Sequence, residues 1–306
     1  MPLLMSALPN NMRSPLRVNG RRWCAIIGLL MASLVMGGCS AVRLAYNNAP
    51  DLTYWWLDGY FDFDGAQSLR LRNDLKNLQD WHRQSELPQL AETLKNLNTA
   101  APQPVAPDQV CKLSTYLEER VQTVLDRAAP TAVALAPSLT VAQLDHLARA
   151  LDKRNREWRE EWLDGTPEQR NERRLKKLVE RAEGFYGRLS DEQRALLQTQ
   201  LDTSVFDASL QYREILRRQQ DVLQTLRALR NSNAADIHVQ AEVRALVARS
   251  LQSPDPVIKQ YTDRVRTQTC GAIAAFHNST SASQRSKLQQ TLHGYEADVR
   301  ALMART

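Results

Sequence analysis

Leucine and valine recur every three or four positions along most of the chain, and this spacing constrains the fold more than any other feature. The clearest runs lie in residues 71–78, 87–97, 110–124 and 288–302. Residues three and four apart share one face of an α-helix, so each run predicts an amphipathic helix. The alternation typical of strands is nearly absent. The sequence therefore predicts an all-α fold, a bundle of about seven to eight helices arranged as long antiparallel hairpins.

Proline and glycine mark where these helices are expected to end. The predicted breaks lie at residues 100–107, 130–137, 164–167 and 253–256, because both residue types interrupt regular helix. Pro88 is expected to kink the helix around it. Four helix starts carry a hydroxyl residue followed three positions later by glutamine, the pattern of a capping box. They are Thr140 with Gln143, Thr166 with Gln169, Ser190 with Gln193, and Ser281 with Gln284.

The first 38 residues have the composition of a secretory signal. They contain four arginines and no acidic residue, and an apolar run from Trp23 to Met36 leads to Gly37, Gly38 and Cys39. The run is shorter than the ~20 apolar residues that span a bilayer, so a permanent transmembrane helix is the weaker interpretation. Residues 36–39 resemble the bacterial lipobox, with Met36 in place of the usual leucine. The alternative is an ordinary signal peptide with a chance cysteine.

The lipobox resemblance implies that the chain is cut before Cys39 and that this cysteine carries the lipid. By resemblance to lipoprotein sorting rules, Ser40 at the second mature position implies the periplasmic face of the Gram-negative outer membrane. Each buried CH₂ of an acyl chain contributes about 0.8 kcal/mol to membrane binding, so several chains anchor firmly. The expected organisation is a signal peptide (1–38), an anchor with an aromatic-rich segment (39–65) and a helical domain (66–306).

The remaining cysteines predict one disulfide. Cys24 is lost with the signal, which leaves Cys111 and Cys270 in an oxidising compartment. Closing so long a loop stabilises the fold by on the order of 4–5 kcal/mol in the loop-entropy model. Two buried free thiols or an exchange-active pair are the alternatives, but no Cys-x-x-Cys spacing indicates redox catalysis.

Removing the signal also removes most of the positive charge. Without its four arginines the chain has 36 basic and 34 acidic residues, a net charge of +2. So small a charge implies no nucleic-acid partner. Residues 153–181 mix both signs densely, which is typical of a solvated helical hairpin. If one face of that hairpin is basic, it is a candidate contact for anionic lipid or an acidic protein.

Two pairs of tryptophans are candidate contact residues. Trp55 and Trp56 lie in an aromatic-rich stretch soon after Cys39, and such rings are favoured at membrane interfaces. The alternatives are a groove for a partner and, as the favoured interpretation, a plug at one end of the bundle. Trp158 and Trp162, four residues apart, fit either a binding ridge or, more often, a helix seam. The acidic residues Asp58, Asp62 and Asp64 do not have the spacing of a calcium loop.

Motifs for catalysis are missing from the sequence. The five histidines are scattered, and no metal-ligand spacing, nucleophile elbow, phosphate loop or dinucleotide fingerprint occurs. No cofactor or metal is expected, and the protein is predicted not to be an enzyme. An envelope hydrolase or transferase with a site assembled from distant residues is the least favoured alternative.

Two family resemblances bear on function. Residues 139–143 and 189–193 resemble the Leu-Thr/Ser-x-x-Gln motif of Spy/CpxP-like periplasmic chaperones, although helix capping alone produces the same pattern. Residues 38–50 and 55–62 resemble a family of Gram-negative lipoproteins with no assigned activity, and this likeness extends loosely over most of the mature chain. Together these observations predict a lipid-anchored periplasmic protein that binds another envelope component without catalysis. A membrane-tethered chaperone or envelope-stress protein is the alternative.

Overall fold

The structure, a computed structural model, describes residues 38–233 and 237–304. Within these ranges the chain forms only helices. They are α2 (Gly38–Asn47), α3 (Ala49–Phe61), α4 (Gly65–Ala100), α5 (Pro107–Leu135), the 3-10 helix η1 (Ala136–Ser138), α6 (Val141–Trp162), α7 (Pro167–Tyr186), α8 (Asp191–Asp202), α9 (Ala208–Leu229), α10 (Ile237–Leu251), α11 (Pro256–Asn278) and α12 (Ala282–Met303). The all-α prediction is confirmed. The predicted signal segment, apart from Gly38, lies outside the described residues.

The number of helices was predicted too low. The described chain has eleven α-helices, because short breaks that contain no proline also end helices. Asn48 separates α2 from α3, and Asp62 adopts a left-handed conformation (φ 50°) that ends α3. The predicted break at Pro130 was wrong, since α5 continues through it to Leu135. A proline costs one backbone hydrogen bond, and packing of the following turn through Val133 offsets that loss.

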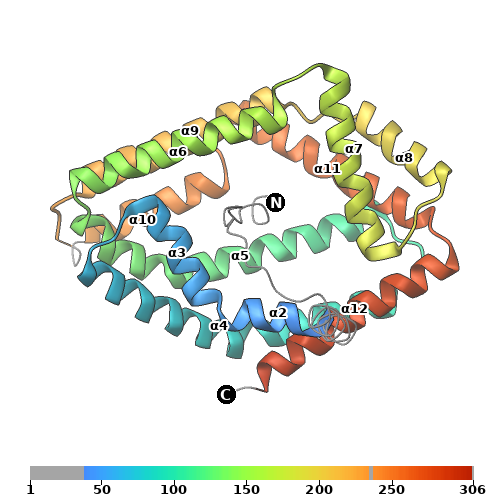
Figure 1. Ribbon diagram of the computed structural model, residues 1–306, viewed down its shortest axis with the longest axis horizontal. Helices are drawn as coiled ribbons and strands as arrows, with labels where there is room; N and C mark the ends of the chain where they lie inside the picture. Colours follow the sequence, from blue (N-terminus) through green and yellow to red (C-terminus); the bar gives the residue numbers. More distant parts are fainter. Residues whose placement is uncertain (1–37, 234–236, 305–306) are drawn as a thin grey trace, which may run out of the picture.

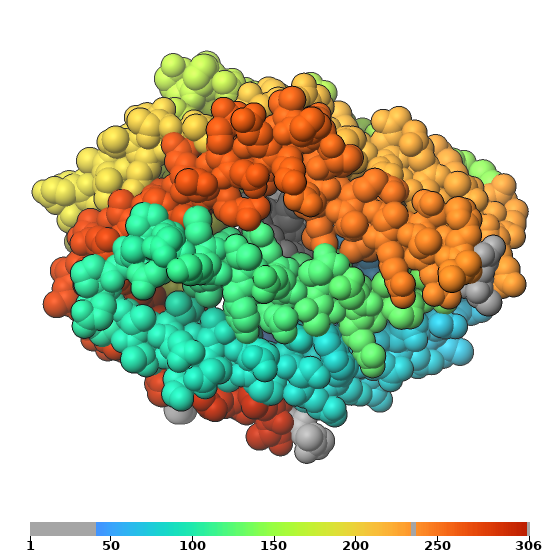
Figure 2. All heavy atoms as spheres, turned by 180° about the vertical axis from the view of Figure 1, so that it is seen from behind, coloured from blue at the N-terminus to red at the C-terminus, as the bar shows by residue number. Residues whose placement is uncertain are grey.

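The helices outline a closed frame (Figure 1). Helices α6 and α9 run side by side along one long edge, and α4 and α12 pack together along the opposite edge. Helices α7 and α8 form a corner, and α5 passes between the two edges. Figure 2, from behind, shows α5 in green and α11 in orange across this face, with a hollow between them near its centre.

Apolar side chains gather at the corners and edges of this frame in several separate clusters. The largest combines residues of α5, η1, α6, α9 and α10 around Leu144, Leu229 and Val239. A second joins α4 to α12 around Leu87 and Leu302, and further clusters join α7, α8 and α11, and α4 to α12 near Ala101. Each cluster is local, so the joints between helix pairs set the shape of the whole frame.

Two pairs of helix N-termini are joined by the same hydrogen-bonding scheme, which is built from capping boxes. All four predicted boxes are present, and Asp64 with Gln67 adds another at the start of α4. The Gln143 amide donates to Gln67 Oε1 at 2.6 Å, and Gln67 donates back at 3.5 Å. Each amide also donates to a carbonyl two residues before the partner's cap, Gln143 to Asp62 and Gln67 to Ser138. The N-termini of α4 and α6 are thereby joined by mutual hydrogen bonds, and we call two helix starts joined in this way crossed.

The starts of α8 and α12 are crossed in the same way. Gln193 and Gln284 exchange amide hydrogen bonds at 2.7 and 2.8 Å. Gln193 also donates to the Ser279 carbonyl and Gln284 to the Arg188 carbonyl, again two residues before each cap. Gln143 and Gln193, the glutamines of the two Leu-Thr/Ser-x-x-Gln stretches, therefore do not pair with each other. Each instead joins its helix to one further helix start.

A disulfide between Cys111 and Cys270 ties α5 to α11, as predicted, with Cα atoms 5.4 Å apart. The two cysteines are 159 residues apart in the sequence. The loop-entropy model gives about 5 kcal/mol for a loop of that length. This bond therefore links the long helix that passes between the edges to the later part of the frame.

Candidate functional site

Two short helices follow the predicted lipidation site. Cys39 lies in the first turn of α2, and α3 begins after Asn48 with Pro50 in its first turn. A proline is tolerated there because the first helical N–H groups have no intrahelical acceptor. At the other end of α3 the Asp58 carboxylate accepts a hydrogen bond from the Phe63 backbone N–H at 3.0 Å. This contact fixes the turn that leads into α4.

One face of α3 belongs to the core. Tyr54 is 7% exposed, its hydroxyl lies 2.9 Å from Ser68 Oγ, and the Arg72 guanidinium lies 3.5 Å from the centre of its ring. The aromatic rings of Phe61 and Phe63 stack on each other and pack against the largest apolar cluster. These aromatic residues have the position of a plug at this end of the frame.

The opposite face of α3 exposes large apolar side chains. Trp55 is 62% exposed, Trp56 57% and Leu52 48%. Their spacing of three and four residues places them in one row along the helix, with exposed Gly59 continuing it. Leu44 of α2, upstream, is 66% exposed. We call Leu52, Trp55 and Trp56 the apolar stripe; the aromatic segment is thus divided between the core and the surface.

Helix α2 is held to the frame largely by polar contacts. Arg43 pairs with the buried Asp298 of α12 at 2.9 Å. The Tyr46 hydroxyl lies 3.0 Å from His82 Nδ1 of α4, while the Tyr46 ring packs beside the cluster that joins α4 to α12. Gln79 also donates to the Tyr46 carbonyl. One of the contacts that dock α2 thus involves a titratable ring, His82.

The burial of His82 predicts a pH-dependent stability. Burial lowers the pKa of His82, and the nearby Glu86 carboxylate opposes this only in part. The unfolded chain therefore binds a proton more readily, and the contribution of neutral His82 to stability is lost as pH falls below about 6.5. We expect the midpoint of thermal unfolding to fall more between pH 7.5 and 5 in the wild type than in His82→Gln. Tyr46→Phe, which keeps the buried ring, is expected to retain the wild-type pH dependence; equal slopes in all three proteins would contradict the prediction.

Trp158 and Trp162 lie elsewhere, in the seam between α6 and α9. The Trp158 ring stacks on Tyr212 with centroids 5.3 Å apart, and Trp162 contacts Phe206 at 5.7 Å. Further along the seam Asn155 and Gln219 exchange amide hydrogen bonds of 2.8 and 2.9 Å. Both tryptophans are half-buried, and their aromatic partners are each other, Tyr212 and Phe206 rather than residues of the apolar stripe.

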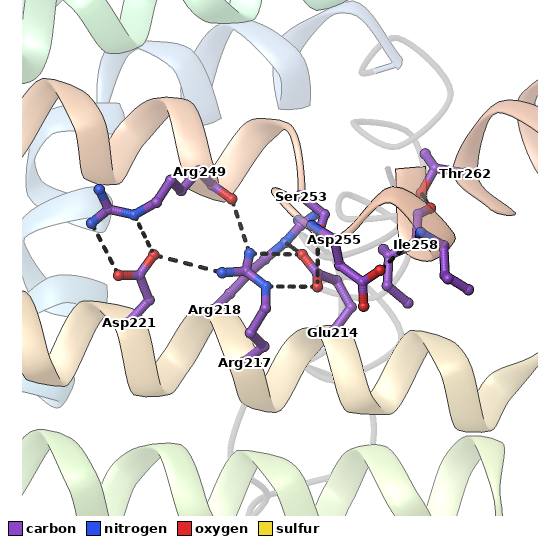
Figure 3. Close-up of polar contacts among 10 residues, drawn as sticks. Glu214, Arg217, Arg218, Asp221, Arg249, Ser253, Asp255, Ile258 and Thr262 are labelled. Atoms are coloured by element: carbon purple, nitrogen blue, oxygen red, sulfur yellow. Dashed lines mark hydrogen bonds and ion pairs between the residues drawn. The ribbon is translucent and has the colours of Figure 1, made fainter. Parts of the chain in front are cut away.

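Sequence reasoning missed a buried ion network where α9 meets α10 and the start of α11 (Figure 3). The Glu214 side chain is 3% exposed and accepts two hydrogen bonds from Arg217, both 2.8 Å, and one from Arg218 at 2.7 Å. Ser253 adds a fourth at 3.1 Å. Burial alone raises the pKa of the Glu214 carboxyl, but these hydrogen bonds outweigh it and hold the pKa below its usual value.

The network extends to a second carboxylate. Arg249 of α10 donates to both oxygens of Asp221 at 2.9 and 3.0 Å, and Arg217 donates to the Arg249 backbone carbonyl at 2.9 Å. Both carboxylates accept hydrogen bonds from guanidinium groups within the protein. This arrangement joins helices and presents no free acid, base or nucleophile.

Neither a metal site nor a membrane span emerges from the described part of the chain. No three His, Cys, Asp or Glu side chains in residues 38–233 and 237–304 are grouped so that they hold a metal ion. Within the same ranges no helix combines the length and the apolar character needed to cross a bilayer.

The comparisons with known proteins identify the family of the chain. No curated protein and no solved structure matches it. A family model matches residues 59–252, from the end of α3 to the residue after α10, which is more than half of the chain. The chain therefore belongs to the Family of unknown function (DUF6279).

Proposed function

We propose that this protein is a lipid-anchored protein of the Gram-negative envelope that acts by binding another envelope component rather than by catalysis. Lipid on Cys39 holds the chain to the periplasmic face of the outer membrane. The disulfide, the crossed helix starts and the Glu214 network keep the frame rigid, which suits a protein that presents fixed surfaces.

One observation carries this proposal. The chain places a cysteine of lipobox type in the first turn of α2, and exposed apolar side chains follow it in α2 and α3. Large apolar side chains that stay exposed next to one another usually mark a surface that contacts a membrane or a protein. The Glu214 and Asp221 carboxylates of the buried network, by contrast, both accept hydrogen bonds from arginines and offer no support for catalysis.

Mass spectrometry of the mature protein tests the anchor. We expect an N-terminal Cys39 that carries two or three acyl chains, and recovery of the protein with outer-membrane vesicles. Cys39→Ser is expected to leave the signal uncleaved and to remove the protein from that fraction. A wild-type chain with an unmodified N-terminus at another position would contradict the anchor.

A chaperone-like role is the second candidate, because the apolar stripe is also a surface on which an unfolding client can bind. An aggregation assay separates the two functions. Suppression of client aggregation at near-stoichiometric amounts, lost in Trp55→Gln/Trp56→Gln, would favour the chaperone. Without suppression, cross-linking in cells for a specific envelope partner is the next experiment.

A further inference from the structure

We propose that the apolar stripe of Leu52, Trp55 and Trp56 inserts into the headgroup region of the lipid bilayer and so fixes how the frame lies on the membrane. This inference rests on the proposed lipid anchor and names what its neighbouring surface binds. The occupant is the phospholipid interface itself, not a groove on another protein.

The geometry of α3 favours a planar, apolar contact. The three side chains form one row, and the opposite face of the same helix is fixed by buried Tyr54. Between Asp51 and Asp58 the helix contains no charged residue. Both flanking carboxylates are engaged within the protein, Asp51 with Arg72 at 2.9 Å and Asp58 with the Phe63 backbone. The stripe therefore reaches outward without an unpaired charge beside it.

The position of the stripe in the chain brings it to the membrane. Cys39 and Trp56 are separated by two short helices, which at 1.5 Å per residue span at most about 25 Å. Lipid chains on Cys39 thus hold the stripe close to the headgroup layer, where its effective concentration is high and weak binding suffices. Leu44 of α2, 66% exposed, lies between the anchor and the stripe.

Residue type and area favour lipid over protein. Tryptophan rings combine an apolar body with one N–H donor and are enriched at membrane interfaces. A large aromatic side chain buries ~150–250 Å², so the stripe offers on the order of 600 Å² at most. That is less than the ~800 Å² per partner of a standard protein interface. The same area is sufficient for weak membrane binding when the lipid on Cys39 already holds the protein at the bilayer.

Fluorescence quenching tests the insertion. Mature, lipidated protein is reconstituted in phosphatidylcholine vesicles with or without bromine on the acyl chains near the headgroups. We expect brominated lipid to reduce the tryptophan emission of the wild type, and most of that loss to disappear in Trp55→Gln/Trp56→Gln. The matched control, Trp158→Phe/Trp162→Phe, removes the two seam tryptophans of α6 and is expected to keep the quenching. Circular dichroism checks that both variants remain helical.

The outcomes separate this inference from the anchor. A lipidated wild type that floats with vesicles but is not quenched would overturn the insertion and leave the anchor standing. Quenching of a chain that mass spectrometry shows to carry no acyl group would support the insertion and remove the anchor. A wild type that neither floats nor is quenched overturns both. An unquenched protein that sediments as a dimer would assign the stripe to a second copy and likewise overturn the proposal.

Discussion

Glu214→Ala is expected to lower the free energy of unfolding by about 3 kcal/mol, the lower end of the range for removing one partner of a buried ion pair. The Glu214 side chain is 3% exposed, and its loss leaves Arg217, Arg218 and Ser253 without a shared acceptor. The arginines are 28% and 37% exposed, so water replaces part of what they lose. This partial solvation is why the upper end of the range is not expected.

Chemical denaturation monitored by circular dichroism measures the loss. The matched control is Glu157→Ala, because Glu157 pairs with Arg154 at 3.2 Å on the surface of α6 with 48% of its side chain exposed. An exposed pair of this kind contributes less than about 1 kcal/mol. Similar losses in the two variants would show that the Glu214 network does not hold α9 to α10.

The pH dependence of the Glu214 contribution has a defined sign. Because the folded-state pKa lies below 4.5, the usual value for glutamate, the ionised carboxylate stabilises the fold above about pH 4.5. That contribution is lost as pH falls through the lower, folded-state pKa. Glu214→Gln lacks the charge at every pH, so the difference in stability between it and the wild type should shrink on acidification.

The fold class and the covalent link were predictable from the sequence because both rest on local or compositional rules. Apolar spacing of three and four residues reports helices directly, and the expectation of an oxidising compartment for Cys111 and Cys270 predicted the disulfide that the structure contains. The number of helices was not predictable, because breaks such as Asn48 contain neither proline nor glycine. The end of α5 was misplaced because core packing around Val133 overrides the local effect of Pro130.

The candidate site was only half visible in the sequence. Aromatic residues follow one another so closely in α3 that spacing alone does not show which face is buried. The structure assigns Tyr54 to the core and its neighbours Trp55 and Trp56 to the surface. Likewise Glu214 with Arg217 and Arg218 has the i+3 and i+4 spacing of ordinary solvated pairs. Contact with Ser253, in the connection between α10 and α11, is part of the burial that makes the difference.

The acidic residues before α4 show the same limit. Asp58, Asp62 and Asp64 invite comparison with a metal site, but their roles are conformational. Asp58 fixes the turn after α3, Asp62 supplies the left-handed residue and Asp64 caps α4. Asp64 and Gln67 form a capping box that the Ser/Thr-x-x-Gln pattern does not include. Only the structure shows that this box is crossed with the one at Thr140.

Gln143→Ala is expected to cost about 3 kcal/mol of unfolding free energy, more than a capping residue alone contributes. The substitution removes the hydrogen bond from the Thr140 N–H and those to the Asp62 carbonyl and to Gln67 Oε1. Gln67 Oε1 then keeps only the hydrogen bond from the Asp64 N–H. Each hydrogen bond contributes ~0.5–1.5 kcal/mol, so the loss of three of them accounts for the expected cost. Gln169→Ala is the matched control, because Gln169 completes an exposed capping box and is therefore expected to cost no more than about 1.5 kcal/mol.

Urea unfolding of double variants then tests whether the crossing itself is responsible. Gln67→Ala and Gln143→Ala should be non-additive, because each already breaks the bond that the other would lose. Gln143→Ala and Gln193→Ala lie in different joints and should add. If Gln143→Ala and Gln169→Ala lower the free energy of unfolding equally, or if the effects of Gln67→Ala and Gln143→Ala add, the glutamines act only as helix caps. Non-additivity confined to each pair would identify the two crossed starts as independent joints that set the shape of the frame.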